Sequence, residues 1–240
     1  MSCGGWRKKI LIDAHLGVAL DIAEGNWRRK HQVVPKWIDR AALLADDMTN
    51  NEQEHLSLHF MVSCRTLAVL AAIQSDVRPT KTAERVVELA RALNEESSDE
   101  LFKRQLAWEL GAAYVDALRI VHYQGQSDQA MKYGTDAVKI LEEVSKSREA
   151  TSSQLFLLAE LYFLQGSVYA IFEKDHDVAV EWYDKSTKLL TAPLPKFSAK
   201  RSAQIGDWLV SMGVSYWRSD DKETALEMTE KGSQMIEEAV

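Results

Sequence analysis

The stretch VAVEWYDKSTKLL, residues 178–190, shows a clear helical period. Its apolar residues recur three or four positions apart, so they form one stripe along a helix and leave the charged residues off that stripe. The stripe consists of Val178, Ala179, Trp182, Tyr183, Leu189 and Leu190. Residues 83–93 and 130–141 carry the same period. The sequence therefore predicts amphipathic helices as its building element.

Turn-forming residues divide the chain into ten predicted helices. Their expected ranges are about 6–24, 34–48, 52–76, 80–95, 98–124, 127–147, 152–173, 176–190, 198–218 and 221–238. The four prolines and eleven glycines are too few for an all-β chain, which needs a turn every 8–12 residues or so. Short connections favour antiparallel neighbours, so we expect an all-α fold of about five helix hairpins.

Small residues recur at a fixed spacing of 47 residues. Gly17, Cys64 and Gly111 form one such series, and Gly166 and Gly213 form another. Repetition at a period of this size is typical of a solenoid, in which each helix pair buries its apolar face against its neighbours. Small residues allow helix backbones to approach closely, so we expect these positions at the contacts between helices.

The last two predicted hairpins share a pattern of small and aromatic residues. The final hairpin has Gly213, Tyr216, Ala225 and Gly232, and the one before it has Gly166, Tyr169, Ala179, Tyr183 and Ser186, with a turn one residue longer. This pattern resembles the tetratricopeptide repeat, closely over 155–238 and loosely over 50–154. The resemblance implies a right-handed α-solenoid. It also implies a concave face, lined by the first helix of each pair, that binds a partner.

The earlier hairpins depart from the standard repeat in length. Gly111 and Ala130 are 19 residues apart, where Gly213 and Ala225 are 12 apart. The additional seven residues add about two turns to the first helix of the pair. We expect a single domain over 1–240, with a divergent hairpin at 1–50, long-helix repeats at 51–149 and the closest match to the standard repeat at 150–240. The groove is expected to change depth or curvature near 145–155.

The charge and the apolar pattern limit the classes of partner. A net charge of −7 argues against nucleic acid. We see no uninterrupted apolar run of the roughly 18–20 residues that span a bilayer, and two cysteines provide no disulfide framework. We therefore expect a cytoplasmic protein with neither a nucleic-acid nor a membrane partner.

The sequence offers little for catalysis. His55 and His59 stand four apart on a predicted helix and face one side, but no third metal ligand or HExxH motif accompanies them. Cys64 lies in an apolar run, which argues for a buried and unreactive thiol. No glycine-rich phosphate loop occurs. We therefore expect no enzyme activity, no cofactor and no metal.

The concave positions implied by the resemblance are mostly apolar and somewhat acidic. They are Gln105, Trp108, Glu109 and Ala112, then Glu160, Phe163, Leu164 and Ser167, then Asp207, Val210, Ser211 and Val214. The Lys, Asn and Arg residues with which related domains hold a terminal carboxylate are absent from these positions. The predicted partner-binding residues are Trp108, Glu109, Phe163, Val210 and Trp217.

These observations favour a protein–protein interaction scaffold that binds a partner peptide or helix. One alternative is a regulatory or sensor repeat module of a larger protein that binds in cis. Another is a small-ligand binder or enzyme with a site near His122 and Glu109. The last predicted helix keeps its apolar stripe almost to Val240, so we expect either a longer protein or a homodimer through this end.

Overall fold

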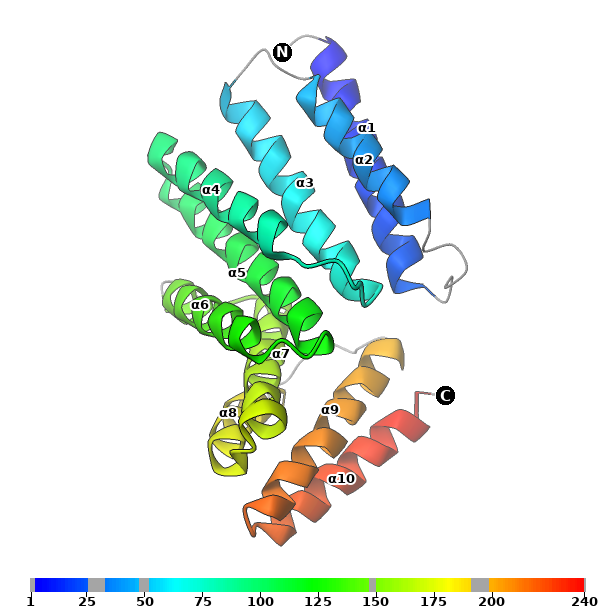
Figure 1. The fold of residues 1–240 in the computed structure, drawn as a ribbon, viewed down its shortest axis with the longest axis vertical. Helices are drawn as coiled ribbons and strands as arrows, with labels where there is room; N and C mark the ends of the chain where they lie inside the picture. The colour runs from blue at the N-terminus through cyan, green and yellow to red at the C-terminus, as the bar shows by residue number, and fades with distance from the viewer. Residues whose placement is uncertain (1–2, 26–32, 48–51, 147–149, 191–198, 240) are drawn as a thin grey trace. The chain divides into compact units, whose positions relative to one another are not determined.

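The computed structural model describes residues 3–25, 33–47, 52–146, 150–190 and 199–239, and the regular secondary structure in these ranges is helical (Figure 1). The helices are α1 (Cys3–Glu24), α2 (Val34–Asp46), α3 (Glu52–Ala72), α4 (Thr80–Glu96), α5 (Glu100–Tyr123), α6 (Ser127–Ser145), α7 (Ser152–Val168), the π-helix η2 (Tyr169–Glu173), α8 (His176–Leu190), α9 (Ala199–Arg218) and α10 (Lys222–Glu237). The all-α prediction is confirmed, and most helix boundaries fall within a few residues of those expected.

The chain divides into two compact units, Met1–Val144 and Ser145–Val240. The first contains α1 to α6 and the second contains α7 to α10. The single domain expected over 1–240 stays a prediction, and its expected internal boundary between 149 and 150 lies close to this division.

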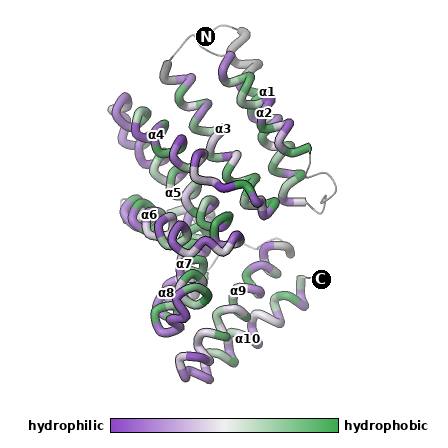
Figure 2. The backbone as a smooth tube through the Cα atoms, in the orientation of Figure 1, coloured by the Kyte–Doolittle hydropathy of each residue, from purple (hydrophilic) through white to green (hydrophobic). Residues whose placement is uncertain are grey.

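Consecutive helices pack as pairs inside each unit. In the first unit α1 packs on α2 and α3 on α4, and α3 also contacts α1 and α5. In the second unit α7 packs on α8 and α9 on α10, and α8 contacts α9. Polar and apolar residues alternate along the helices (Figure 2), as expected where each helix buries one stripe. This packing is consistent with a helical repeat.

Four hairpin turns share one backbone device, a residue in the left-handed conformation just after the first helix. These residues are Gln74 (φ 50°), Gly125 (φ 73°), Lys174 (φ 59°) and Asp220 (φ 65°). After three of them the next amide bonds back to the carbonyl five residues earlier, as in a Schellman motif: Ser75 to Leu70, Gln126 to Val121 and Asp221 to Tyr216. These turns thus share one backbone pattern, although three of the four residues are not glycine.

The remaining turn, at Lys174 between η2 and α8, belongs to the hairpin whose sequence is one residue longer. Here the amide of Asp175 bonds to the carbonyl of Tyr169, six residues earlier, at 3.2 Å. The helix ends in the π-helix η2, whose wider turn holds one residue more than an α-turn. The longer spacing between Gly166 and Ala179 is therefore taken up inside the helix and not in the loop.

Most of the repeated small residues lie at close helix contacts. A Cβ added at Gly111 would collide with the Leu141 side chain, and one added at Gly166 would collide with the Tyr183 ring. Gly17 differs, since it is exposed and has nothing within 4 Å of such a Cβ. The expectation that the 47-residue series marks helix contacts is therefore wrong at its first member.

Candidate functional site

The second unit contains a hollow of about 790 Å³ bordered by α7, η2, α8 and α9, here called the α7–α9 hollow. It is lined by Phe163, Ser167, Ala170, Ile171, Lys174, His176, Tyr183, Ser211, Val214, Ser215 and Arg218. The lining includes predicted concave positions on both α7 and α9, namely Phe163, Ser167, Ser211 and Val214. The first helices of the two hairpins therefore border one hollow.

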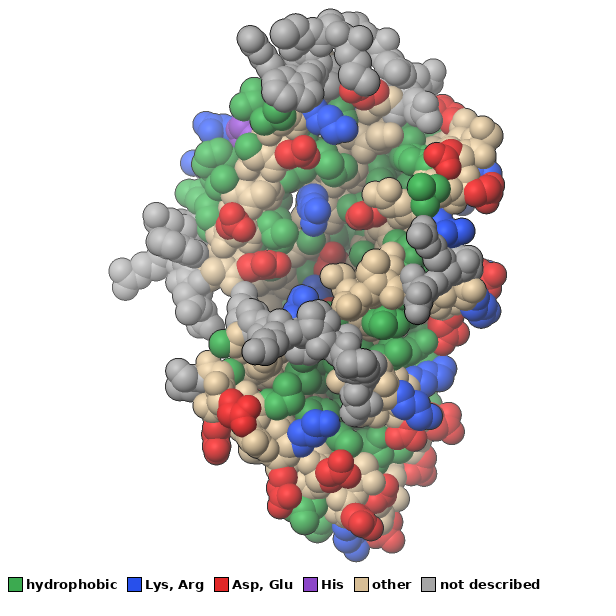
Figure 3. Space-filling model, turned by 180° about the vertical axis from the view of Figure 1, so that it is seen from behind, with side chains coloured by type: hydrophobic (Ala, Val, Ile, Leu, Met, Phe, Trp, Pro, Cys, Tyr) green, Lys and Arg blue, Asp and Glu red, His purple; other side chains and the backbone are tan. Residues whose placement is uncertain are grey.

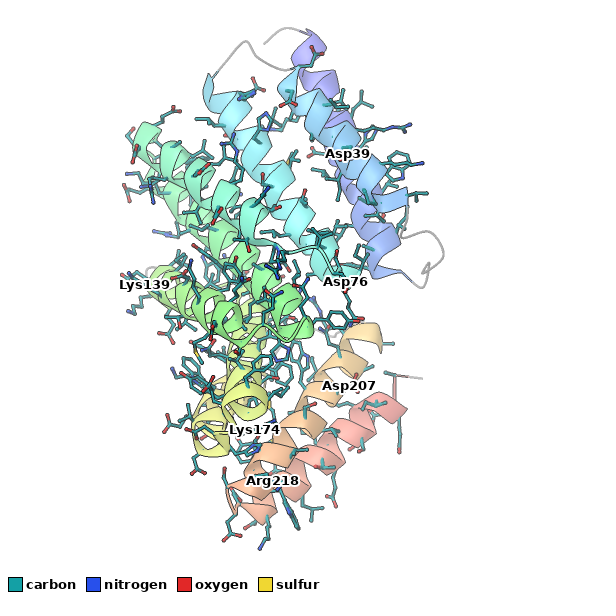
Figure 4. The ribbon with its side chains drawn as sticks, viewed as in Figure 1. Asp39, Asp76, Lys139, Lys174, Asp207 and Arg218 are labelled. Carbon is teal, nitrogen blue, oxygen red and sulfur yellow. The ribbon has the colours of Figure 1, made fainter. Side chains whose placement is uncertain are left out.

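Two cations lie at the rim of this hollow. Lys174 follows η2 directly and its backbone is left-handed, while Arg218 is the last residue of α9 (both labelled in Figure 4). Lys174 and Arg218 are not among the predicted concave positions, because both lie at the ends of their helices. None of the lining residues is acidic. The hollow therefore combines an apolar floor with a positively charged rim.

Hydroxyl groups and a histidine complete the lining. Nδ1 of His176 lies 3.1 Å from Oγ of Ser215, which is almost fully buried. Burial raises the pKa of Tyr183 to about 12, and hydrogen bonds with Ser215 and Ser167 oppose that rise. The serine and tyrosine hydroxyls are neutral groups that can donate or accept hydrogen bonds. They suit a ligand that carries oxygen acceptors.

Phe163 belongs both to the core and to the hollow. Its ring stacks on Trp208 at a centroid distance of 5.0 Å and lies 6.0 Å from the ring of Tyr183, and the residue is 9% exposed. A side chain with this burial presents only an edge to a ligand. Its role in binding would be to form part of the floor.

The other two predicted residues of this unit lie outside the hollow. Val210 is half-buried, and an added Cβ on Gly232 of α10 would touch it, so it faces the α9–α10 contact. Trp217 is 59% exposed and lines a neighbouring depression, which shares Val214 and Arg218 with the α7–α9 hollow. The Lys222 ammonium lies 5.8 Å from the centre of the Trp217 ring. Of the three binding residues predicted in this unit, Phe163 alone lines the α7–α9 hollow, and the role of all three in binding a partner stays a prediction.

The first unit has a smaller hollow of about 310 Å³ between α3 and α5, here called the α3–α5 groove. Apolar side chains such as Phe60 and Phe102 form part of it, and Arg65, Gln105, Glu109 and Asp116 contribute polar groups. Glu109 thus lines the α3–α5 groove, and its role in binding a partner stays a prediction. Its neighbour Trp108 is 9% exposed and is part of the core of this unit.

Cys64 lines the α3–α5 groove, but its thiol is expected to be unreactive. Burial raises the pKa of its thiol well above the ordinary value, and the charges of Glu109 and Asp116 raise it further. The thiolate is the nucleophilic form, so a raised pKa argues against reactivity. His122 and Glu109, the residues of the alternative small-ligand site, are 13 positions apart on one helix. They are therefore about 20 Å apart along its axis, too far to contact one small ligand together.

A polar cluster joins α2 and α3. Nε2 of His59 lies 3.0 Å from Nε2 of His55 and 3.2 Å from Oδ1 of Asp46. Burial lowers the pKa of His59, nearby His55 lowers it further, and Asp46 opposes the change. The spacing along the chain does not indicate this third group beside the two histidines, because Asp46 belongs to a different helix.

The surface shows no concentration of one charge on the face drawn in Figure 3. Among the described residues of that face, acidic and basic side chains are interspersed with apolar ones. The expectation that nucleic acid is not a partner stays a prediction.

No protein-family model matches this chain, and no curated protein matches it in sequence. The resemblance to the tetratricopeptide repeat therefore rests on the residue pattern alone.

Within the part of the chain that the structure describes, two segments, Glu54–Ala72 and Ser152–Glu173, are long and apolar enough to cross a membrane by length and composition. The core helices of soluble proteins pass the same test, so this is weak support for a membrane span. In the second segment, 61% of the apolar window is buried inside the structure. The cytoplasmic location and the lack of a membrane partner stay predictions.

Proposed function

We propose that this protein is a non-catalytic interaction scaffold, a right-handed tetratricopeptide-like solenoid that binds a partner peptide in the α7–α9 hollow. The observation that carries the proposal is the lining of this hollow. Predicted concave residues of α7 and α9 border it together, and two cations stand at its rim. The cytoplasm is the location that we propose for this interaction.

The chemistry of the hollow defines the kind of peptide. Phe163, Ile171 and Val214 offer apolar area, which suits a large apolar side chain of the partner. Lys174 and Arg218 offer charge-assisted hydrogen bonds to a carboxylate. An exposed ion pair contributes only about 0–1 kcal/mol, so the apolar contact supplies most of the affinity and the cations supply the selectivity.

The test uses a displayed library of random 12-residue peptides selected on the full chain. We expect the enriched peptides to pair an apolar residue with a nearby Asp, Glu or free C-terminal carboxylate. Fluorescence anisotropy then measures each enriched peptide and its amide analogue, in which the acid is neutralised. The amide should bind several-fold more weakly.

Variants connect this binding to the hollow. Arg218→Glu reverses one rim charge, and Lys174→Asn removes the other while keeping a residue type that tolerates the left-handed backbone. Both should weaken acidic peptides at least several-fold. Lys231→Glu is the matched control, since Lys231 is exposed on α10 and is not among the lining residues. Equal binding by all of these variants, with unchanged thermal melting, would contradict the proposal.

A small anionic ligand is the second candidate for the same hollow. The volume lies in the usual range for small-molecule sites, about 300–1,000 Å³. The convergence of His176, Ser215 and Tyr183 on one side favours this candidate. Competition separates the two, because a small carboxylate or phosphate that displaces the peptide at micromolar concentration would identify the small ligand as the occupant.

A further inference from the structure

We infer that Asp46, His55 and His59 form a zinc site that connects the end of α2 to the start of α3. The inference goes beyond the proposed function, since it concerns other residues in the other compact unit. Its evidence is the arrangement of three ligand atoms that neither helix assembles alone.

The distances between the ligand atoms suit a tetrahedral ion. One nitrogen from each histidine and one carboxylate oxygen all lie within 4.8 Å of one another. The two closest pairs are His55 Nε2 to His59 Nε2 at 3.0 Å and His59 Nε2 to Asp46 Oδ1 at 3.2 Å. Zinc binds such atoms at about 2.0–2.2 Å, so tetrahedral geometry places two ligands roughly 3.3–3.5 Å apart. Small side-chain rotations would therefore accommodate the ion.

The two helices bring the ligands together for different reasons. His55 and His59 are four residues apart on α3, so they lie on one face of that helix. Asp46 is the last residue of α2, a helix that packs on α3. Ala45 and Leu58, which precede Asp46 and His59, belong to one buried cluster. The apolar packing of α2 on α3 thus holds the carboxylate next to the imidazoles.

The exposure of the cluster is suitable for an ion that enters from solvent. The side chain of His59 is 16% exposed and that of Asp46 is 64% exposed. Packing thus holds the His59 ring in place, while the Asp46 carboxylate is accessible to solvent. A water molecule would occupy the fourth position, as in zinc sites with three protein ligands.

The donor set selects the class of metal. Two imidazole nitrogens suit zinc and its transition-metal neighbours, whereas magnesium and calcium prefer oxygen ligands throughout. A metal bound here would tie two helices together and would stabilise the folded state, because the unfolded chain does not hold the three groups in place.

Without a metal, Nε2 of His59 lies within hydrogen-bonding distance of both the His55 ring and the Asp46 carboxylate. A zinc site and a purely structural polar cluster can be distinguished by titration, since only the zinc site binds one zinc ion per chain. The experiment titrates zinc into the full chain, first stripped with a chelator, by isothermal titration calorimetry. We expect one zinc ion per chain and no comparable heat with magnesium.

Variants assign the binding to these residues. Asp46→Asn keeps the size of an exposed side chain, and His59→Gln removes the central nitrogen. Each should weaken zinc at least about tenfold. The control His15→Gln removes a histidine of α1 that lies outside the cluster, and it should leave the affinity unchanged. Zinc should also raise the melting temperature of the wild type but not that of Asp46→Asn.

Three results would overturn the inference. They are no zinc binding by the wild type, equal binding by wild type and Asp46→Asn, and a loss in His15→Gln as large as in the cluster variants. Circular dichroism of each metal-free variant confirms that it is folded. If His59→Gln is unfolded, Asp46→Asn alone decides the outcome. Failure here leaves peptide binding in the second unit untouched.

Discussion

The hydroxyl of Tyr216 on α9 donates a hydrogen bond to Oδ1 of Asp184 on α8, at 2.6 Å. The bond joins two consecutive hairpins of the second unit, and the tyrosine is only 3% exposed. Burial raises the pKa of Tyr216, and the Asp184 carboxylate, which accepts its hydrogen bond, raises it further. The contact between α8 and α9 thus contains a polar bond with a defined direction.

Removing this hydroxyl should destabilise the second unit. Tyr216→Phe keeps the ring but leaves Asp184 without the donated hydrogen bond, and we expect a loss of about 1–2 kcal/mol in the free energy of unfolding. Urea denaturation followed by circular dichroism measures the loss. Tyr123→Phe is the control, since Tyr123 is 55% exposed, and it should change stability by less than about 0.5 kcal/mol. Equal stabilities for the two variants would show that the bond contributes nothing.

The same tyrosine should make the fold sensitive to alkali. The pKa of tyrosine in an unfolded chain is about 10, and the folded value for Tyr216 lies above it. Above pH 10 or so the unfolded chain releases the proton while the folded chain keeps it, so stability falls as pH rises. Tyr183, with a pKa of about 12, acts in the same direction. Thermal melts from pH 8 to 11 should show a smaller decline for Tyr216→Phe than for wild type.

The α9–α10 contact should not tolerate a methyl group at Gly232. A Cβ there would lie 2.5 Å from the carbonyl oxygen of Gly206 and 3.0 Å from the backbone nitrogen of Val210. Backbone atoms cannot rotate aside, so the helices would have to separate. We expect Gly232→Ala to destabilise the protein by about 1–3 kcal/mol, although alanine is the better helix former. A higher melting temperature for this variant would contradict the close approach.

Gly17 should respond in the opposite sense. It lies in the interior of α1 with open space around an added Cβ, so alanine meets no obstacle. Alanine also loses less backbone freedom on folding, and we expect Gly17→Ala to stabilise by about 0.5–1 kcal/mol. The sign of this change is read directly from a shift in the urea midpoint. A destabilised variant would mean that another surface covers this face of the helix.

Cys64 should resist alkylation. Its raised pKa keeps the thiol protonated at neutral and mildly alkaline pH, so the reactive thiolate is scarce. Mass spectrometry after iodoacetamide treatment at pH 8 should show unmodified Cys64 in the folded protein and rapid modification in urea. Rapid modification of the folded protein would place the thiol at the surface.

The sequence was informative where structure is local. Stripes of apolar residues are set by the helical period, and the helix boundaries at Thr80 and Leu190 match the prediction. Polar residues along the chain predict where the turns lie. They do not predict the left-handed backbone at Lys174, since lysine rarely adopts that conformation. Local patterns therefore gave the helices, while the details of the turns depended on how the pairs pack.

The candidate sites were harder to predict because they depend on tertiary placement. Asp46 meets His59 only when α2 packs on α3, and the spacing along the chain contains no sign of it. Arg218 reaches the hollow from the end of a helix, beyond the positions that a standard repeat uses. Tryptophan is a residue type that often binds partners, but the burial of Trp108 shows that it belongs to the core.

The π-turn of η2 identifies a place where the length of the chain itself can be changed. Deleting one residue from 169–173 would allow an ordinary α-turn and would keep the helix continuous. A π-turn absorbs its additional residue within one wider turn, so the residues that follow would keep nearly their present direction after the deletion. This hairpin can therefore gain or lose one codon while Lys174 stays at the hollow.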